Sequence, residues 1–242
     1  GFDVQGVESS KTIARMANDA GVPTLNQFFN LDVARGLGRK FGVINAGAFR
    51  LQPNQPIPPT EIIRSQLLFG EDLRPEGIHI GEEIVALLRD LAERKLLAEL
   101  AAKESLPVVT LTDGPLELFR EKEAGAAKLY QKHFGEYLAA LEQLSSLSAV
   151  TAGYVDRPRA DLVVRLLELT LIPEADFAKK AGKQHPLDGV RDVDLYTGLL
   201  QPGQRSPIFS IISPSAREFK DPLALHFFYI NVGGPTGPYL AR

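Results

Sequence analysis

The feature that most constrains the fold of this sequence is a long predicted helix that leads directly into a predicted strand. Residues 81–103 have no Gly or Pro after the first position and are rich in Leu, Ala, Glu and Arg, which predicts one long helix. Pro107 follows, and the β-rich run Val108–Thr112 predicts a strand that ends at Asp113-Gly114-Pro115. The alternation of such elements along the chain predicts an α/β or α+β fold with a mixed sheet flanked by helices.

The other predicted elements are interleaved in the same way. The predicted strands cover residues 2–7, 41–51, 149–155, 208–212 and 225–232. The predicted helices cover residues 9–20, 24–29, 32–39, 117–145, 158–171 and 193–200, and a further helix is expected to begin at Thr60. Four prolines make residues 52–59 a loop, and residues 173–191 form a polar loop. The apolar stripe expected to face the core in the helix 158–171 consists of Leu162, Val163, Leu166 and Leu167.

Composition limits the chemistry available to the chain. There is no cysteine, which excludes disulfides, zinc–thiolate sites and thiol catalysis, and the four histidines lack metal-ligand spacing. Any metal site must therefore be built mainly from carboxylates, which favours Mn²⁺ or Mg²⁺. The net charge of −3 argues against a surface coated for nucleic acid but leaves room for a local basic groove. No apolar run approaches the roughly 20 residues of a membrane span. No secretory signal is visible at the N-terminus, so we expect a cytoplasmic protein.

Asp113 is the first candidate for chemistry. The alternation of a strand places it on the same face as Val109 and Leu111, which we expect to be buried. A carboxylate at the C-terminal end of a sheet strand lies where α/β folds bind ligands. The alternative is an ordinary turn residue, because Asp-Gly is a common turn dipeptide.

Glu93 is the second candidate, within the predicted helix 81–103. It shares a helical stripe with Leu96, Leu97 and Leu100, which we expect to pack inward. A buried carboxylate is costly unless it meets a cation or a metal. The alternative is a position at the edge of the stripe, with an ion pair to Arg89 or Lys95.

Two connecting segments place arginines at the ends of predicted elements. Residues 153–159 join a strand to a helix and carry Arg157 and Arg159, and residues 201–206 join a helix to a strand and carry Arg205. Arginine in such places suits contact with phosphate. Ordinary surface ion pairing is the alternative for each of them.

Four segments resemble motifs of the NurA nuclease family. Residues 112–116 (TDGPL) look like the family's DGSL strand end, with Pro115 in place of Ser. Residues 88–93 (LRDLAE) are similar to its Arg-rich helix with a metal-binding Glu. Residues 153–159 (GYVDRPR) and 199–206 (LLQPGQRS) resemble its GYVDRPRS and LLxPGERS motifs. The four motifs occur in the family's order over residues 41–242.

The resemblance implies an RNase H-like α/β fold and a DNA nuclease that depends on Mn²⁺ or Mg²⁺. It implies 5′–3′ exonuclease and single-strand endonuclease activity on single-stranded DNA and double-strand ends, in the end resection of double-strand breaks. It further implies a homodimer that docks on a HerA-type hexameric ATPase. Asp113 and Glu93 are then the expected catalytic metal ligands. The expected DNA contacts are Arg157, Arg159, Arg205 and Tyr229.

The first 40 residues depart from the family. The family's first strand carries a third metal-binding carboxylate, for which Asp32 has roughly the right spacing and Asp3 is the alternative. A chain without this carboxylate would be a non-catalytic NurA-like subunit of a HerA complex. Residues 1–40 themselves resemble a segment of a SAM-dependent C-methyltransferase, so a methyltransferase fragment is a further alternative. We therefore expect an atypical segment at 1–40 and a NurA-like domain at 41–242, short at its C-terminal end relative to the family.

Overall fold

The structure is a computed structural model that describes residues 41–50, 60–105, 107–118, 126–156, 158–183, 185–233 and 240–241. The elements predicted within residues 1–40 and the proline-rich loop 52–59 lie outside the described residues. The chain divides into two compact units, residues 1–110 with 119–151 and residues 111–118 with 152–242, and each is described by itself. No helix in the described part of the chain is both long and apolar enough to cross a membrane.

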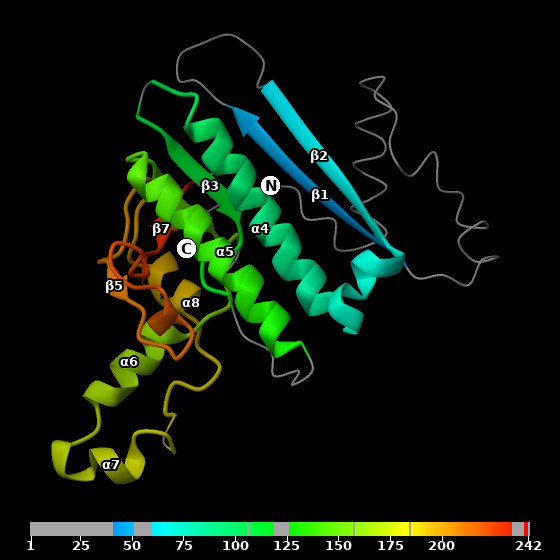
Figure 1. The fold of residues 1–242 in the computed structure, drawn as a ribbon. Coiled ribbons are helices and arrows are strands. Elements are labelled where there is room, and N and C mark those ends of the chain that lie inside the picture. The colour runs from blue at the N-terminus through cyan, green and yellow to red at the C-terminus, as the bar shows by residue number, and fades with distance from the viewer. Residues whose placement is uncertain are drawn as a thin grey trace, which may run out of the picture. The chain divides into compact units, whose positions relative to one another are not determined.

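The described elements are labelled as in Figure 1. The strands are β1 (Phe41–Arg50), β2 (Thr60–Phe69), β3 (Val109–Asp113), β4 (Val150–Tyr154), β5 (Phe209–Ser210), β6 (His226–Phe227), β7 (Ile230–Asn231) and β8 (Leu240–Ala241). The α-helices are α4 (Glu82–Ala101), α5 (Ala127–Ser146), α6 (Leu162–Thr170), α7 (Phe177–Lys180) and α8 (Asp192–Thr197). Short 3-10 turns are found at Gly70–Leu73, Pro75–Gly77, Glu174–Asp176 and Ala216–Glu218.

A long antiparallel hairpin, β1–β2, forms one layer of the first unit. The strands pair from Phe41 opposite Phe69 to Arg50 opposite Thr60. Alternation puts Ile44, Ala46 and Ala48 of β1 on the buried face, as expected for a half-buried strand. The helix expected to begin at Thr60 is wrong, because pairing with β1 along all ten residues of β2 satisfies its backbone as a strand.

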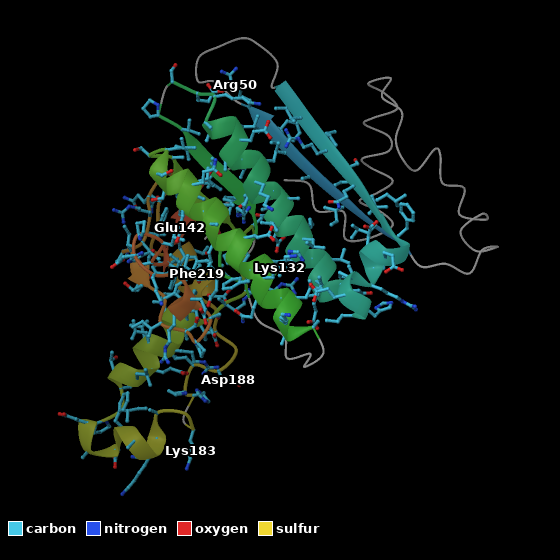
Figure 2. All side chains as sticks on the ribbon, in the orientation of Figure 1. Arg50, Lys132, Glu142, Lys183, Asp188 and Phe219 are labelled. Atoms are coloured by element: carbon cyan, nitrogen blue, oxygen red, sulfur yellow. The ribbon has the colours of Figure 1, made fainter. Side chains whose placement is uncertain are left out.

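Helices α4 and α5 cover this hairpin. In Figure 1, α4 runs along the hairpin and α5 lies beside α4, in agreement with the contacts between these elements. Ala46, Ala48 and Leu96 pack together between β1 and α4, because small residues let the helix approach the strand closely. A second cluster joins the hairpin to both helices and contains Ile44, Leu68, Leu73, Ile80, Ile84, Ala126 and Leu129. An ion pair from Arg50 Nε to Glu104 Oε1 at 2.7 Å lies on the surface near the end of β1 (Figure 2).

Strands β3 and β4 are joined through α5 as a βαβ connection. The Val150 amide donates to the Val108 carbonyl, and the Gly114 amide donates to the Tyr154 carbonyl. The beginnings of the two strands therefore lie side by side, and so do their ends, which means that the strands run parallel. Both strands begin in the first unit and end in the second.

The core of the second unit is organised around the fully buried Asp192. Its carboxylate accepts the backbone N–H groups of Val163 and Val164 at the start of α6, with Oδ1 at 3.0 and 2.8 Å. Its Oδ2 accepts the hydroxyl of Tyr229 at 2.7 Å. Asp192, the first residue of α8, thus caps the N-terminus of a different helix, α6. It accepts backbone N–H groups there that would otherwise be unpaired.

This arrangement changes the predicted buried face of α6. Val163 and Val164 are buried, whereas Leu162, Leu166 and Leu167 are between 40% and 50% exposed. The expected stripe is therefore wrong except for Val163. The buried face is set by Asp192 and by the packing of Val163 against Tyr196 and Tyr229.

The segment after α7 is tied back to α6 by the buried Glu168. Its carboxylate accepts the Leu187 amide at 2.7 Å and Arg165 NH1 at 2.8 Å, and Arg165 also reaches Asp188 at 3.2 Å (Figure 2). Burial alone would raise the pKa of Glu168, but the hydrogen bonds from Arg165 and Leu187 outweigh it and hold that pKa below its usual value. The segment is therefore fixed to α6 through an ionised carboxylate.

The described fold is a mixed α/β arrangement of two-stranded sheets flanked by helices, which agrees with the expected class. Strands β1, β3 and β4 and helix α4 lie within a few residues of the predicted ranges. The predicted helices at 117–145 and 158–171 begin late, at Ala127 and Leu162. The polar loop expected at 173–191 contains the short helix α7.

Candidate functional site

Asp113 is the last residue of β3, in the second unit. Its side chain is exposed, and within the described part of the chain its carboxylate has no hydrogen bond or ion pair. The strand ends here because Gly114 turns the chain with a φ of 87°, a backbone conformation that residues other than glycine rarely adopt. A hydrogen bond of 2.8 Å from the Gly114 amide to the Tyr154 carbonyl fixes the strand end against β4. The carboxylate is thus held at a rigid strand end and is open to a ligand.

The burial of β3 is opposite to the prediction. Asp113 does share a face with Val109 and Leu111, but that face is exposed, with Val109 at 64% and Leu111 at 58%. The buried residues are Thr110 and Thr112, whose hydroxyls bond to Thr151 Oγ1 and to the Ala152 carbonyl on β4. Because these hydrogen bonds satisfy the polar side chains, the threonines can be buried at low cost. The expected burial of Val109 and Leu111 is wrong, and Asp113 is accessible as a result.

Gly153 lies directly beneath the turn that follows Asp113. A Cβ atom at this position would lie 2.4 Å from the Gly114 carbonyl oxygen, 2.9 Å from the Leu116 amide and 3.0 Å from the Pro115 carbonyl carbon. All three are backbone atoms and cannot rotate away. The glycine of the segment 153–159 therefore allows the Asp113 turn to pack on β4.

Glu93 lies on the buried face of α4, in the first unit, as its stripe with Leu96 predicts. It is 7% exposed, and its ion pair is with Arg94, NH1 to Oε2 at 3.7 Å, rather than with Lys95, which pairs with Glu136. Arg94 is also buried, its guanidinium lies 5.5 Å from the centre of the Tyr137 ring, and two of its nitrogens have no hydrogen-bond partner among the described residues. Burial raises the pKa of Glu93, and the nearby Arg94 offsets this only in part. Glu93 is thus a buried carboxylate that Arg94 does not fully compensate.

The raised pKa of Glu93 predicts a pH dependence in metal-free protein. In EDTA, the folded state binds a proton at Glu93 more tightly than the unfolded state does. The stabilising contribution is complete below the unfolded pKa near 4.5 and is lost as pH rises through the higher folded pKa. Glu93→Gln carries no such loss. The denaturation midpoint of the variant relative to wild type should therefore rise as the pH increases above about 4.5, and a difference that does not change with pH would contradict the prediction.

The structure describes two of the three expected metal ligands, and these two belong to different units. Glu93 belongs to the first unit and Asp113 to the second, and Asp32 lies outside the described residues. Within the described ranges, no group of three or more acidic or histidine side chains forms a ready metal site. The donors at hand are carboxylate oxygens, and their chemistry fits a hard divalent cation.

The expected DNA contacts also differ from one another. Arg159 is exposed and has no ion pair within the described part of the chain, whereas Arg157 lies outside it. Arg205 is exposed, donates from NH1 to the Ser206 carbonyl at 2.9 Å, and lies 5.9 Å from the centre of the Phe228 ring, which is itself 39% exposed. Tyr229 is fully buried against Asp192, so its placement does not fit the expected contact with DNA.

Two buried carboxylates that join distant segments, Asp192 and Glu117, escaped the sequence analysis. Asp192 holds the start of α6 and Tyr229, which lie 28 to 37 residues away along the chain. Glu117 is buried four residues after Asp113 and accepts hydroxyl groups from Ser213 and Ser215. Neither pairing has a local signature. The one sequence signal that could have drawn attention to Glu117 is its position only four residues after Asp113.

Comparison with known proteins adds one match. A family model described as the NurA domain matches residues 36–241. No curated protein and no solved structure matches the chain. The matched range includes Glu93, Asp113, Arg159 and Arg205, and it begins after Asp32.

Proposed function

The chain belongs to the NurA family, because the family match spans most of its length, and on this premise we propose that it is a divalent-metal-dependent DNA nuclease. The observation that carries the proposal is the exposed Asp113 carboxylate at the end of β3, which has no hydrogen bond or ion pair among the described residues. In its fuller form, the proposal is an RNase H-like enzyme with 5′–3′ exonuclease and single-strand endonuclease activity. It would act as a homodimer with a HerA-type hexameric ATPase in DNA end resection.

Glu93 and Asp113 are the residues proposed to hold Mn²⁺ or Mg²⁺. Bound there, such a cation polarises a water molecule and neutralises charge on the scissile phosphate. Glu93 suits this role because burial already disfavours its uncompensated charge, so a cation would relieve a cost that Arg94 leaves in place. Asp32 is kept as the proposed third ligand, although the family match does not extend to it.

Arg159, Arg205 and Phe228 are proposed to contact the DNA strand. Arg159 is exposed and has no ion pair among the described residues, so it can bond a phosphate without first breaking a salt bridge. Phe228 offers an exposed aromatic ring beside Arg205, a combination that suits the stacking of an unpaired base near a phosphate. These features support single-stranded DNA as the bound form.

The proposal is tested by incubating the protein with a 5′-labelled single-stranded oligonucleotide in Mn²⁺, in Mg²⁺ and in EDTA. We expect cleavage with a divalent cation and none in EDTA. The same oligonucleotide labelled at its 3′ end gives the polarity, and a circular single strand separates endonuclease from exonuclease activity. Absence of cleavage by folded protein under every metal condition would reject the nuclease proposal.

A second candidate is a NurA-like subunit without catalytic activity. The observation that favours it is the absence of a three-ligand acidic group among residues 41–233 as far as they are described. Co-purification with a HerA-type ATPase, together with no cleavage in the assay above, would support this candidate. Metal-dependent cleavage that Asp113 variants lack would exclude it.

A further inference from the structure

Glu117 lies four residues after the end of β3 and bonds two serines of a distant loop. It is buried, and its Oε1 accepts the hydroxyl of Ser215 at 2.6 Å as well as the hydroxyl of Ser213. Ser213 Oγ in turn accepts the Ala216 amide at 2.9 Å. That amide occupies an acceptor position on Ser213, which leaves the Ser213 proton for Glu117. The result is a hydrogen-bonded cluster that joins residues 96 to 98 positions apart in the sequence.

The same turn is held at its other end by β4. The Gly114 amide bonds to the Tyr154 carbonyl, and Gly153 leaves room for the backbone of residues 114–116. The five-residue run from Asp113 to Glu117 is therefore fixed to β4 at its start and to the serine loop at its end. All of these contacts lie within the second unit.

We propose that Glu117 is the residue that positions Asp113, by anchoring the turn after β3 to Ser213 and Ser215. The inference rests on the proposed function, in which Asp113 binds the metal. Glu117 acts through the turn: its Oε1 accepts both serine hydroxyls, and this anchoring role requires no contact with the metal. Loss of the anchor frees the turn and misplaces the Asp113 carboxylate.

Three variants separate anchoring from metal binding. Glu117→Ala removes the acceptor, and the double variant Ser213→Ala/Ser215→Ala removes both donors without altering any carboxylate. Glu117→Gln removes the charge but keeps an oxygen that can accept both hydroxyls. Thr170→Val is the matched control, because it deletes a hydroxyl that bonds the Leu167 carbonyl at 2.7 Å in the same unit.

Two measurements on the full chain are needed. Calorimetric titration with Mn²⁺ gives metal affinity, and hydrogen exchange of peptides that cover residues 113–118 reports the order of the turn. We expect Glu117→Ala and the double serine variant to weaken Mn²⁺ binding about 10-fold, the scale typical of residues that orient metal ligands. Both should also speed exchange in this peptide. Glu117→Gln and Thr170→Val should stay near wild type in both measurements.

The outcomes separate this inference from the proposed function. Wild-type Mn²⁺ affinity and exchange in the double serine variant would overturn the anchoring role, even if Glu117→Ala fails to fold. The anchoring role would also be overturned if Glu117→Gln and Glu117→Ala lose Mn²⁺ affinity equally while the double serine variant keeps it. That result would make the Glu117 charge essential. If wild type binds no Mn²⁺, the proposed metal site fails, and exchange alone then decides whether Glu117 orders the turn.

Discussion

Replacing Asp113 with asparagine is expected to lower metal-dependent cleavage of single-stranded DNA at least about 100-fold, because metal-assisted charge stabilisation is worth several kcal/mol. The variant keeps the size and polarity of the side chain and removes only its charge. The fold should be unaffected, since the carboxylate is exposed and has no partner within the described part of the chain. Initial rates of oligonucleotide cleavage at saturating Mn²⁺ are the measurement.

Asp221→Asn is the matched control for this prediction. Asp221 is also exposed and belongs to the same unit, and no hydrogen bond or ion pair of its side chain is found among the described residues. The control should cleave DNA at the wild-type rate, which also excludes a contaminating nuclease as the source of activity. Cleavage by Asp113→Asn within a few-fold of wild type would remove Asp113 from the metal site.

Gly153→Ala is expected to destabilise the second unit by about 3 kcal/mol, at the upper end of the usual cost of overpacking. The added Cβ would lie 2.4 Å from the Gly114 carbonyl oxygen, and relief requires the Asp113 turn or β4 to move. For a chain of this size such a loss corresponds to roughly 6–12 °C in the denaturation midpoint. Because the displaced backbone carries Asp113, we also expect weaker Mn²⁺ binding.

Gly198→Ala is the control in the same unit, because no atom lies within 4 Å of its added Cβ and its φ is negative. Its stability should change by less than about 0.5 kcal/mol, as for most surface substitutions. Thermal and urea denaturation of both variants give the comparison. A Gly153→Ala protein as stable as Gly198→Ala would show that the turn does not pack tightly on β4.

The elements that sequence alone predicted well are those with strong local patterns. Helix α4 has a long run of helix-forming residues, and its stripe correctly put Glu93 on a buried face. Strand β3 was recognised from its β-rich run and from the Asp-Gly-Pro end. In both cases the decisive information lies within about 20 consecutive residues, the range over which periodicity acts.

The failures share a physical cause, which is pairing with distant residues. Strand β2 was expected to be a helix, because nothing local to Thr60 shows that β1 will pair with it. In α6 the local stripe favoured Leu166 and Leu167, whereas Asp192 and Tyr229 select Val163 and Val164. In β3 the alternation correctly grouped Asp113 with Val109 and Leu111 on one face. Hydrogen bonds to β4 decided that the opposite face is the buried one.

The sequence by itself determined the α/β class, the candidates Asp113 and Glu93, and the family to which their motifs belong. These depend on residue type, local periodicity and motif order, which the chain carries along its length. Only the tertiary structure decided that Asp113 is exposed and that Glu117 meets two serines almost 100 residues away. Long-range hydrogen bonds form only when distant segments come together, and in β3 they select the buried face, so the local pattern did not predict these features.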